Sequence, residues 1–210
     1  MGTDTQQELE PGERPWGQQL VNGHRPVQET WNALVANAGT FHNWEHAVVP
    51  GMVQTADYAR YVFLRHAELR DSPRDTDEAV RARMKRQEQL HRADKRFRLL
   101  VWEAVLYSRI CPPSVLAAQL DRLIEVTGLD GVALGIIPFS APLEITPSGG
   151  FAVLDNRLAI TEDWHAELWL DDPETVATYL RVWQTLERSA VYGAEAQRVI
   201  HRARRSLDEG

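Results

Sequence analysis

The stretch that decides the fold is VVPGMVQTADYAR, residues 48–60, in which a Pro-Gly break leads into a helix. Proline fixes the backbone angle φ, and glycine permits a close approach or a positive φ, so a sharp structural turn is the favoured interpretation of Pro50-Gly51. From Met52 to about Ala67 the apolar residues recur at helical spacing. This spacing predicts a surface helix with one face packed on a core.

The segments around this stretch carry helix and turn signals. Apolar residues at helical spacing predict a helix over residues 27–38, and a short turn is expected over residues 41–48. Asp75 followed by Glu78 is typical of a capped helix start, and we expect that helix to reach about residue 93. Pro112-Pro113 and Asp172-Pro173 open two further helices.

Strand patterns gather in the middle of the chain. Residues 97–107 are apolar on both alternating faces, as in a strand buried on both sides or one whose end merges into a helix. Further strands are predicted over residues 132–138, 151–154, 158–162 and 166–170. Short turns join the last three of them. The chain is therefore predicted to be α+β, with helices flanking a small, mainly antiparallel sheet.

Length and composition limit the class of protein. The 210 residues fit one domain over residues 26–210 after a flexible, Pro- and Gly-containing arm over residues 1–25. A net charge of −7 argues against coating nucleic acid or an anionic membrane, and no apolar run is long enough to span a bilayer. The single cysteine, Cys111, excludes an intramolecular disulfide and fits a cytoplasmic location.

Several short motifs occur in a fixed order along the chain. They are VPGMVQTADYAR (49–60), RMKRQEQL (83–90), WEAVL (102–106), AQLDRL (118–123), IIPF (136–139), FAVL (151–154) and ITE (160–162). In this order they resemble the C-terminal antitoxin-like domain, of unknown function, of WhiJ-like actinobacterial helix-turn-helix regulators of the XRE class, common in Streptomyces. The resemblance covers about residues 41 to 200.

The resemblance implies a regulatory domain whose partner is a small protein encoded beside it, or a small molecule. Such regulators carry a DNA-binding domain ahead of this one, and about 40 residues here are too few to contain it. We therefore expect DNA binding not to carry over, and DNA is not an expected partner. A homodimer stays open.

The helix start after Pro50-Gly51 supplies candidate ligand contacts. Gln54, Thr55, Tyr58 and Arg60 stand beside backbone amides that a helix start leaves unsatisfied, an arrangement able to hold an anionic or amide-bearing ligand. Trp102 and Trp164 join the candidate set. Most of the seven tryptophans should lie in the core or a pocket wall, and Trp164, in a short turn beside Glu162, is the one expected to be exposed for recognition. A purely structural use of all these residues is the competing interpretation.

Two glutamates are the candidate catalytic residues. Glu103 lies in the most apolar run of the chain, so its carboxylate must be paired or protonated to be tolerated there. A buried ion pair with an arginine of the segment 83–86 is the favoured interpretation. In the functional alternative, Glu103 binds a cation or moves a proton, and Glu162, which ends a strand, is a second carboxylate of the same kind.

A basic stretch runs through the middle of this acidic chain. A solvated helix face is the default interpretation of such a charge run. A phosphate-bearing partner, tRNA included, would nevertheless bind this stretch first. The residues that would hold it are Arg83, Arg86, Arg92 and Arg96.

Residues 42–46, HNWEH, match the H-x-x-E-H signature of one class of zinc peptidases. On a helix, His42 and His46 would share a face, with Glu45 near a zinc-bound water. Pro50 interrupts any such helix, and no motif selects a third ligand. A zinc hydrolase is thus a remote alternative, and neither a metal nor a cofactor is expected.

Two functions are favoured over the zinc hydrolase. The first is a stand-alone regulatory or antitoxin-like module that binds a small partner protein or a metabolite. The second is a group-transfer enzyme of natural-product metabolism, with Glu103 or Glu162 as acid-base. In one version of it the substrate is an aminoacyl-tRNA, whose phosphates the arginines contact.

Overall fold

The computed structural model describes residues 10–207, and within that range seven strands form one mixed sheet. The strand order is β1-β7-β6-β5-β2-β3-β4. Strands β2, β3 and β4 pair in parallel, and the other four pairings are antiparallel. The α+β fold with a mainly antiparallel sheet is confirmed. The strands are β1 (Gly12–Pro15), β2 (Thr40–Glu45), β3 (Arg96–Trp102), β4 (Val132–Ile137), β5 (Phe151–Leu154), β6 (Leu158–Glu162) and β7 (Ala166–Leu170).

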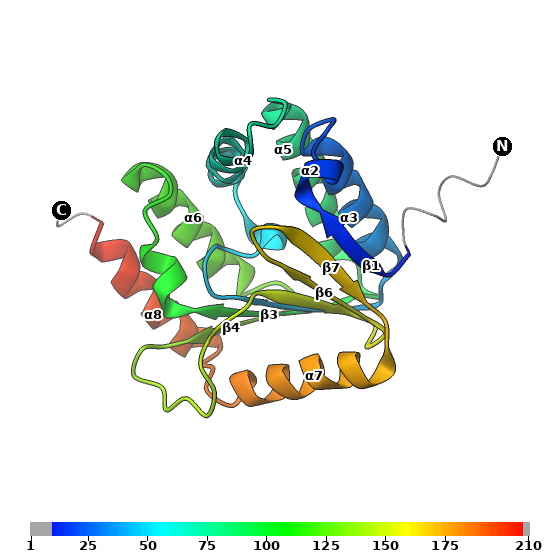
Figure 1. The fold of residues 1–210 in the computed structure, drawn as a ribbon. Coiled ribbons are helices and arrows are strands. Elements are labelled where there is room, and N and C mark those ends of the chain that lie inside the picture. Colours follow the sequence, from blue (N-terminus) through cyan, green and yellow to red (C-terminus); the bar gives the residue numbers. More distant parts are fainter. Residues whose placement is uncertain (1–9, 208–210) are drawn as a thin grey trace.

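Helices cover both faces of the sheet (Figure 1). Helix α7 covers one face alone, where Trp183 packs with Trp44 and Leu100 of the sheet. The other face carries the larger core, which the remaining long helices cover. The helices are α2 (Trp16–Gln19), α3 (Arg25–Asn37), α4 (Ala56–Arg70), α5 (Thr76–Arg86), α6 (Pro113–Val126), α7 (Pro173–Glu187) and α8 (Gly193–Arg205), with 3-10 helices η1 (Gly51–Val53), η2 (Gln87–His91) and η3 (Glu103–Tyr107).

The two-layer cover explains the apolar pattern of β3. Leu99 and Val101 face the larger core, and Leu100 faces α7, so both sides of this central strand are buried. The strand then passes into η3, as one of the two interpretations of residues 97–107 expected. The three closing strands match their predicted ranges, and the Asp172 carboxylate caps α7 by accepting the Thr175 N–H at 2.9 Å.

The turn expected over residues 41–48 is wrong, because Thr40–Glu45 is strand β2 in the middle of the sheet. Phe41 faces the larger core and Trp44 faces α7, so the strand lacks the polar-apolar alternation of a half-exposed strand. Helix α5 also ends earlier than predicted, at Arg86, and continues as η2.

The segment predicted as a loose arm contains an edge strand. Gly12–Pro15 forms β1, which pairs with β7, and Trp16 donates its indole N–H to the Asp163 carbonyl oxygen at 2.8 Å. Residues 1–9 of the arm lie outside the described residues, and the division into arm and domain stays a prediction. Across residues 10–207, none of the helices combines the length and apolar character needed to cross a bilayer.

Candidate functional site

The candidate site lies at the carboxyl edge of the parallel strands, where β5 begins and β6 ends. Trp44 of β2 and Thr161 of β6 both pair with Phe151 of β5. One residue further out, the same registers place Gly150 between Glu45 and Glu162. Two carboxylates therefore flank a glycine at an edge of the kind where sheets of α/β proteins bind ligands.

Gly150 leaves room that a side chain would fill. A Cβ atom at this position would lie 3.0 Å from Oε2 of Glu45 and 3.4 Å from the Trp44 carbonyl oxygen. The Thr161 hydroxyl donates to the Gly150 carbonyl oxygen at 3.0 Å and fixes the backbone there. The floor between Glu45 and Glu162 is therefore bare backbone.

Helix α5 places two arginines against this region. Arg83 donates through Nε to Oε1 of Gln28 at 3.1 Å and through Nη1 to Oε1 of Gln54 at 2.5 Å. Arg86 donates through Nη2 to the same Gln28 oxygen at 3.2 Å. Neutral carboxamides thus hold both guanidinium groups in place without cancelling their charge.

The Pro-Gly break and the basic motif are in direct contact. A Cβ atom at Gly51 would lie 3.2 Å from Nη2 of Arg86 and 3.6 Å from Cζ of Arg83. Gln87 donates to the carbonyl oxygens of Gly51 at 3.3 Å and of Gln54 at 2.7 Å. Residues 49–54 and 83–87, which resemble two motifs of one family, therefore form one structural unit.

Several buried donors in this unit lack acceptors. Arg86 is only 6% exposed, yet among residues 10–207 its Nε and Nη1 have no hydrogen-bond partner. Within the same range, Nε and Nη1 of Arg70, in the last turn of α4, are also without partners. No ion pair within 4.0 Å joins Arg83 or Arg86 to Glu45 or Glu162 in this part of the chain, although the four groups interact electrostatically.

The two carboxylates have raised pKa values. Burial raises the pKa of Glu45 to about 8, the Glu162 carboxylate adds to the rise, and a hydrogen bond from Asn43 opposes it. Burial and the neighbouring Glu167 raise the pKa of Glu162 to about 7, against the opposing arginines. The Glu162 side chain is also solvent-exposed. Glu162 thus combines dense surroundings with access to solvent.

Burial also affects the two arginines, whose pKa values it lowers. Both guanidinium groups still carry their charge at neutral pH, because the ordinary pKa of arginine lies so high. The site thus presents fixed positive charge opposite carboxyl groups that titrate near neutrality.

Glu167, which lies on β7 opposite Glu162, has a structural role. It is 1% exposed and accepts indole N–H bonds from Trp31 at 2.9 Å and Trp169 at 2.8 Å. Burial raises the pKa of Glu167 as well. The bond from Trp31 ties α3 to the hairpin that carries Glu162.

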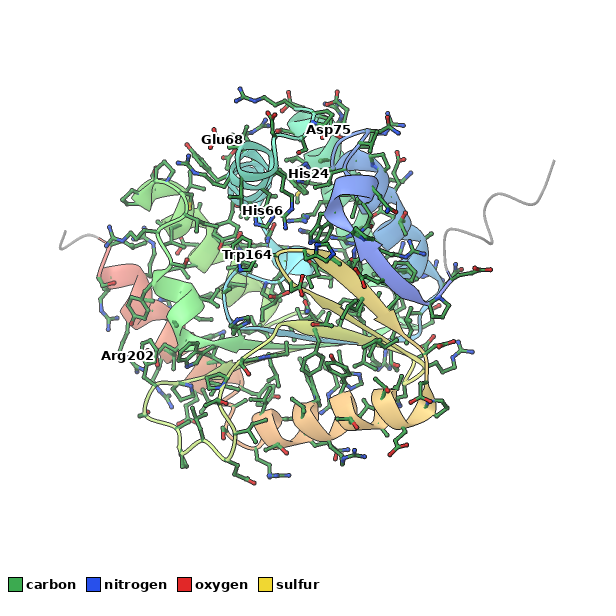
Figure 2. The ribbon with its side chains drawn as sticks, in the orientation of Figure 1. His24, His66, Glu68, Asp75, Trp164 and Arg202 are labelled. Atoms are coloured by element: carbon green, nitrogen blue, oxygen red, sulfur yellow. The ribbon has the colours of Figure 1, made fainter. Side chains whose placement is uncertain are left out.

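The rim of the site is formed by the β6–β7 turn and α4. Trp164 is 78% exposed at the tip of the hairpin, and Arg70 donates to its carbonyl oxygen at 3.4 Å. Figure 2 shows Trp164 at this tip, with His24 and His66 on the side of α4 that faces α2 and the hairpin. Burial and the nearby Arg70 lower the pKa of His66 to about 4. The rim is therefore neutral at His66 and positive at Arg70.

Glu103 does not pair with the arginines of α5, so the expected buried ion pair is wrong. Its Oε2 accepts the Phe139 N–H at 2.7 Å, and its Oε1 lies 3.6 Å from Nη2 of Arg202 on α8. Glu103 follows β3, and β3 and β6 are three strand positions apart, which is about 14 Å at the usual spacing. Glu103 and Glu162 thus belong to separate contact sets.

The residues predicted as ligand contacts at the helix start do not all lie in the candidate site. Gln54 contacts Arg83 and lies in the site. Thr55 caps α4 by accepting the Tyr58 N–H at 3.3 Å, and Tyr58 is fully buried with its hydroxyl accepting the Val49 N–H at 3.4 Å. Arg60 forms an ion pair with Asp77 on the surface. Trp102 lies on the α7 face of the sheet, away from Gln54.

The basic stretch does not form one face. Arg83 and Arg86 point into the site, whereas Arg92 pairs with Asp94 through two contacts of 2.9 Å. Arg96 donates to the carbonyl oxygens of Ala93 and Lys95. Only the first two arginines could contact a ligand at the carboxyl edge.

The zinc interpretation of residues 42–46 is wrong. These residues begin on a strand rather than a helix, and the His42 ring packs on Trp183 of the α7 face at 5.0 Å. Glu45 points to the opposite face, because side chains alternate along a strand. No group of three or more His, Cys, Asp or Glu side chains in residues 10–207 is arranged to hold a metal ion.

Sequence reasoning missed Glu45, Gly150, Gln28 and Arg70 as members of the site. The glycine pair at residues 149–150, directly before a strand, was an available signal for close backbone approach. Gln28 and Arg70 carry no local signal, because helices α3 and α4 bring them to the site only in three dimensions.

An open depression lies at the same sheet edge as the charged cluster. It has a volume of about 490 Å³, begins at the residue after Glu45 and follows the ends of β3 and β4. Its lining residues are His46, Ala47, Ala104, Tyr107, Ser108 and Phe139. The charged cluster and this depression therefore adjoin along one sheet edge.

A family model described as "Domain of unknown function (DUF5753)" matches residues 28–202. No curated protein sequence matches the chain. The fold is similar to Nuc, a phospholipase D family member from Salmonella typhimurium, with a TM-score of 0.49, 9% identity and coverage of 88% of this chain and 97% of that chain.

Two further solved structures are similar at the same low level. NucT from Helicobacter pylori has a TM-score of 0.46 and 10% identity, covering 88% of this chain and 99% of that chain. TrmBL2, an archaeal chromatin protein described with a novel mode of DNA binding, has a TM-score of 0.46 and 11% identity, covering 89% of this chain and 55% of that chain. At these values the three structures carry no inference about function.

Proposed function

The chain belongs to the DUF5753 family, a domain of unknown function, and we propose its role from the site itself. The domain is a regulatory module that binds a small polar metabolite at the carboxyl edge of its sheet. The ligand lies over Gly150, between the carboxylates of Glu45 and Glu162 and the guanidinium groups of Arg83 and Arg86.

The observation that carries this proposal is the state of Arg86. Its Nε and Nη1 are buried without acceptors among the described residues. A buried charged donor that lacks an acceptor destabilises the fold by more than a net hydrogen bond contributes. Oxygen atoms of a ligand would satisfy these donors, and hydrogen bonds from a charged guanidinium group to carboxylate or phosphate oxygens are among the stronger ones in proteins.

The carboxyl groups define the other side of the ligand. With a pKa of about 8, Glu45 is mainly protonated at neutral pH and can donate a hydrogen bond to a ligand. Glu162, with a pKa of about 7, is present in both forms. A ligand that combines acidic or carbonyl oxygens with neutral or positively charged hydrogen-bonding groups fits both sides.

The regulatory part of the proposal draws on the resemblance to the C-terminal domain of WhiJ-like regulators. A small partner protein remains an alternative occupant of the same edge. That DNA is not a partner stays a prediction, and so does the cytoplasmic location. A homodimer is compatible with either ligand class.

The test uses adjacent residues with opposite burial. The full chain, Arg86→Met and Lys85→Met are incubated with a low-molecular-weight metabolite extract and measured by native mass spectrometry. We expect one discrete adduct on the wild type and on Lys85→Met, because Lys85 is exposed on the same helix. Its loss from Arg86→Met supports the proposal. An adduct of equal abundance on Arg86→Met, or none on the wild type, contradicts it.

A second candidate function is group transfer at the same site. The carboxyl groups of Glu45 and Glu162 titrate near neutral pH, where a general acid or base works best. The version that uses aminoacyl-tRNA requires RNA binding that weakens with salt. Retention of total tRNA on a filter at low salt, lost on raising the salt about fourfold, would favour this version. A chain that retains no tRNA at low salt would exclude it.

A further inference from the structure

The depression beside the charged cluster has an aromatic wall. Tyr107 stacks on Phe139 at 6.1 Å between ring centroids and 26° between planes. Trp102 meets the same Phe139 ring edge-on at 6.0 Å and 82°. Phe139 is nevertheless 58% exposed, so one side of its ring faces solvent. An exposed ring held by two neighbouring aromatic side chains offers a flat apolar surface to a ligand.

A buried carboxylate holds this ring in place. Oε2 of Glu103 accepts the Phe139 N–H at 2.7 Å, and Glu103 is only 4% exposed. Arg202 of α8 approaches the other carboxylate oxygen at 3.6 Å. The backbone of Phe139 is therefore anchored at the first residue after Pro138, although its side chain lies on the surface. Glu103 acts here as a positioning residue for the aromatic wall.

The depression also carries a few polar groups. Ser108 and His46 line it, and Nδ1 of His46 is buried without a hydrogen-bond partner among residues 10–207. Burial lowers the pKa of His46, so its imidazole is neutral at neutral pH and can donate or accept. An apolar pocket with a small number of polar groups is the usual composition of a small-molecule site.

We infer that this depression binds a planar aromatic or heteroaromatic ring, which stacks on Phe139 and Tyr107. Its volume of about 490 Å³ falls in the range of small-molecule sites and exceeds what one ring needs. His46 follows Glu45 directly in the chain, so the depression lies at the same sheet edge as the charged cluster. The inference rests on the proposed function in one respect: the ring is one part of the ligand whose polar part contacts Glu45.

The test uses 5-fluoroindole as the probe and fluorine NMR of the full chain. We expect saturable binding to the wild type, and at least tenfold weaker binding to Phe139→Ala and Tyr107→Ala. Leu143→Ala is the matched control, since Leu143 is 44% exposed in the same loop but does not line the depression. Glu103→Ala, which removes the acceptor of the Phe139 N–H, should weaken binding severalfold while circular dichroism and the Tm show a folded chain. Rescue by Glu103→Asp is not expected, because the shorter side chain loses the Phe139 N–H.

Three outcomes would overturn the inference. The first is the absence of saturable binding up to about 10 mM probe, which would mean a Kd weaker than millimolar. The second is equal weakening of probe binding by Leu143→Ala and Phe139→Ala. The third is a wild-type dimer that binds no probe and that Phe139→Ala dissociates. The last would make the aromatic wall a contact between two copies. Arg86→Met separates the two proposals, because it should remove the metabolite adduct and leave 5-fluoroindole binding unchanged.

Discussion

Gly51 lies directly against the guanidinium group of Arg86, since a Cβ atom at position 51 would stand 3.2 Å from Nη2. The Pro-Gly break thus has a function beyond turning the chain. Because Gly51 has no side chain, Arg83 and Arg86 of α5 can lie directly against the backbone of η1. A change at Gly51 should therefore affect the ligand site before it affects the fold.

Gly51→Ala should weaken ligand binding with little loss of stability. The backbone of Gly51 is not in the left-handed region, so alanine introduces no backbone strain, and the methyl group instead displaces the end of the Arg86 side chain. We expect a reduced metabolite adduct in native mass spectra and a change in unfolding free energy below about 1 kcal/mol. Gly128→Ala is the control, because its added methyl group meets only ordinary contacts. An unchanged adduct in Gly51→Ala would count against the guanidinium group as a ligand contact.

Two buried cations should respond in opposite ways to replacement by methionine. Lys95 is 4% exposed and donates to the carbonyl oxygens of Val35, Ala36 and Ala38 at 2.9, 2.8 and 2.6 Å, at the end of α3. Lys95→Met should destabilise the fold by about 2 to 4 kcal/mol, because it leaves these acceptors unsatisfied. Arg86→Met should be neutral or stabilise the fold by about 1 kcal/mol, because it removes a buried charge whose donors are only partly satisfied. Urea unfolding at pH 7 measures both, and a large loss in Arg86→Met would assign Arg86 a purely structural role.

Stability should fall as pH rises through the range set by Glu45. The pKa of Glu45 is about 8 in the folded chain against an ordinary value of 4.5, so the unfolded state loses its proton first. Between these two values the unfolded state binds fewer protons, and the contribution of Glu45 to the unfolding free energy decreases. Glu45→Gln keeps the neutral form at all pH values and should flatten the decrease. Thermal unfolding of both chains at pH 5 and pH 8 measures it, and parallel pH profiles would contradict the raised pKa.

The capping carboxylate of α7 provides a test that is independent of the site. Asp172 accepts both the Thr175 N–H and its hydroxyl at 2.9 Å. Asp172→Ala should destabilise the fold by about 1 kcal/mol, the usual effect of losing an N-cap. Asp171→Ala is the neighbouring control, and equal losses in the two variants would exclude capping as the cause. Neither variant should change the metabolite adduct.

The closing strands and α7 could be predicted because their signals are local. Asp155-Asn156, which adopt positive φ values, mark a turn by residue type alone, and Asp172-Pro173 marks a helix start. Strand β2 could not be predicted, because a strand buried on both faces lacks the polar-apolar alternation that identifies a strand in a sequence. The predicted ion pair between Glu103 and an arginine of α5 was wrong for a different reason. Strand order is a property of the whole sheet, and it separates Glu103 from those arginines.

Half of the residues of the candidate site could be anticipated, because their signals are local as well. Glu162, Arg83, Arg86 and Gln54 belong to motifs that were recognisable in the sequence. Glu45 was noticed only as part of a zinc pattern, because its site neighbours come from β5, β6 and α5, which are distant in sequence.

The edge strand β1 has a mechanical consequence for this site. It pairs with β7, which pairs with β6, the strand that ends in Glu162. Whatever is attached ahead of residue 10 is thus joined to Glu162 of the candidate site through two ladders of backbone hydrogen bonds. A force on the N-terminal segment would therefore be transmitted to the strand that ends at Glu162.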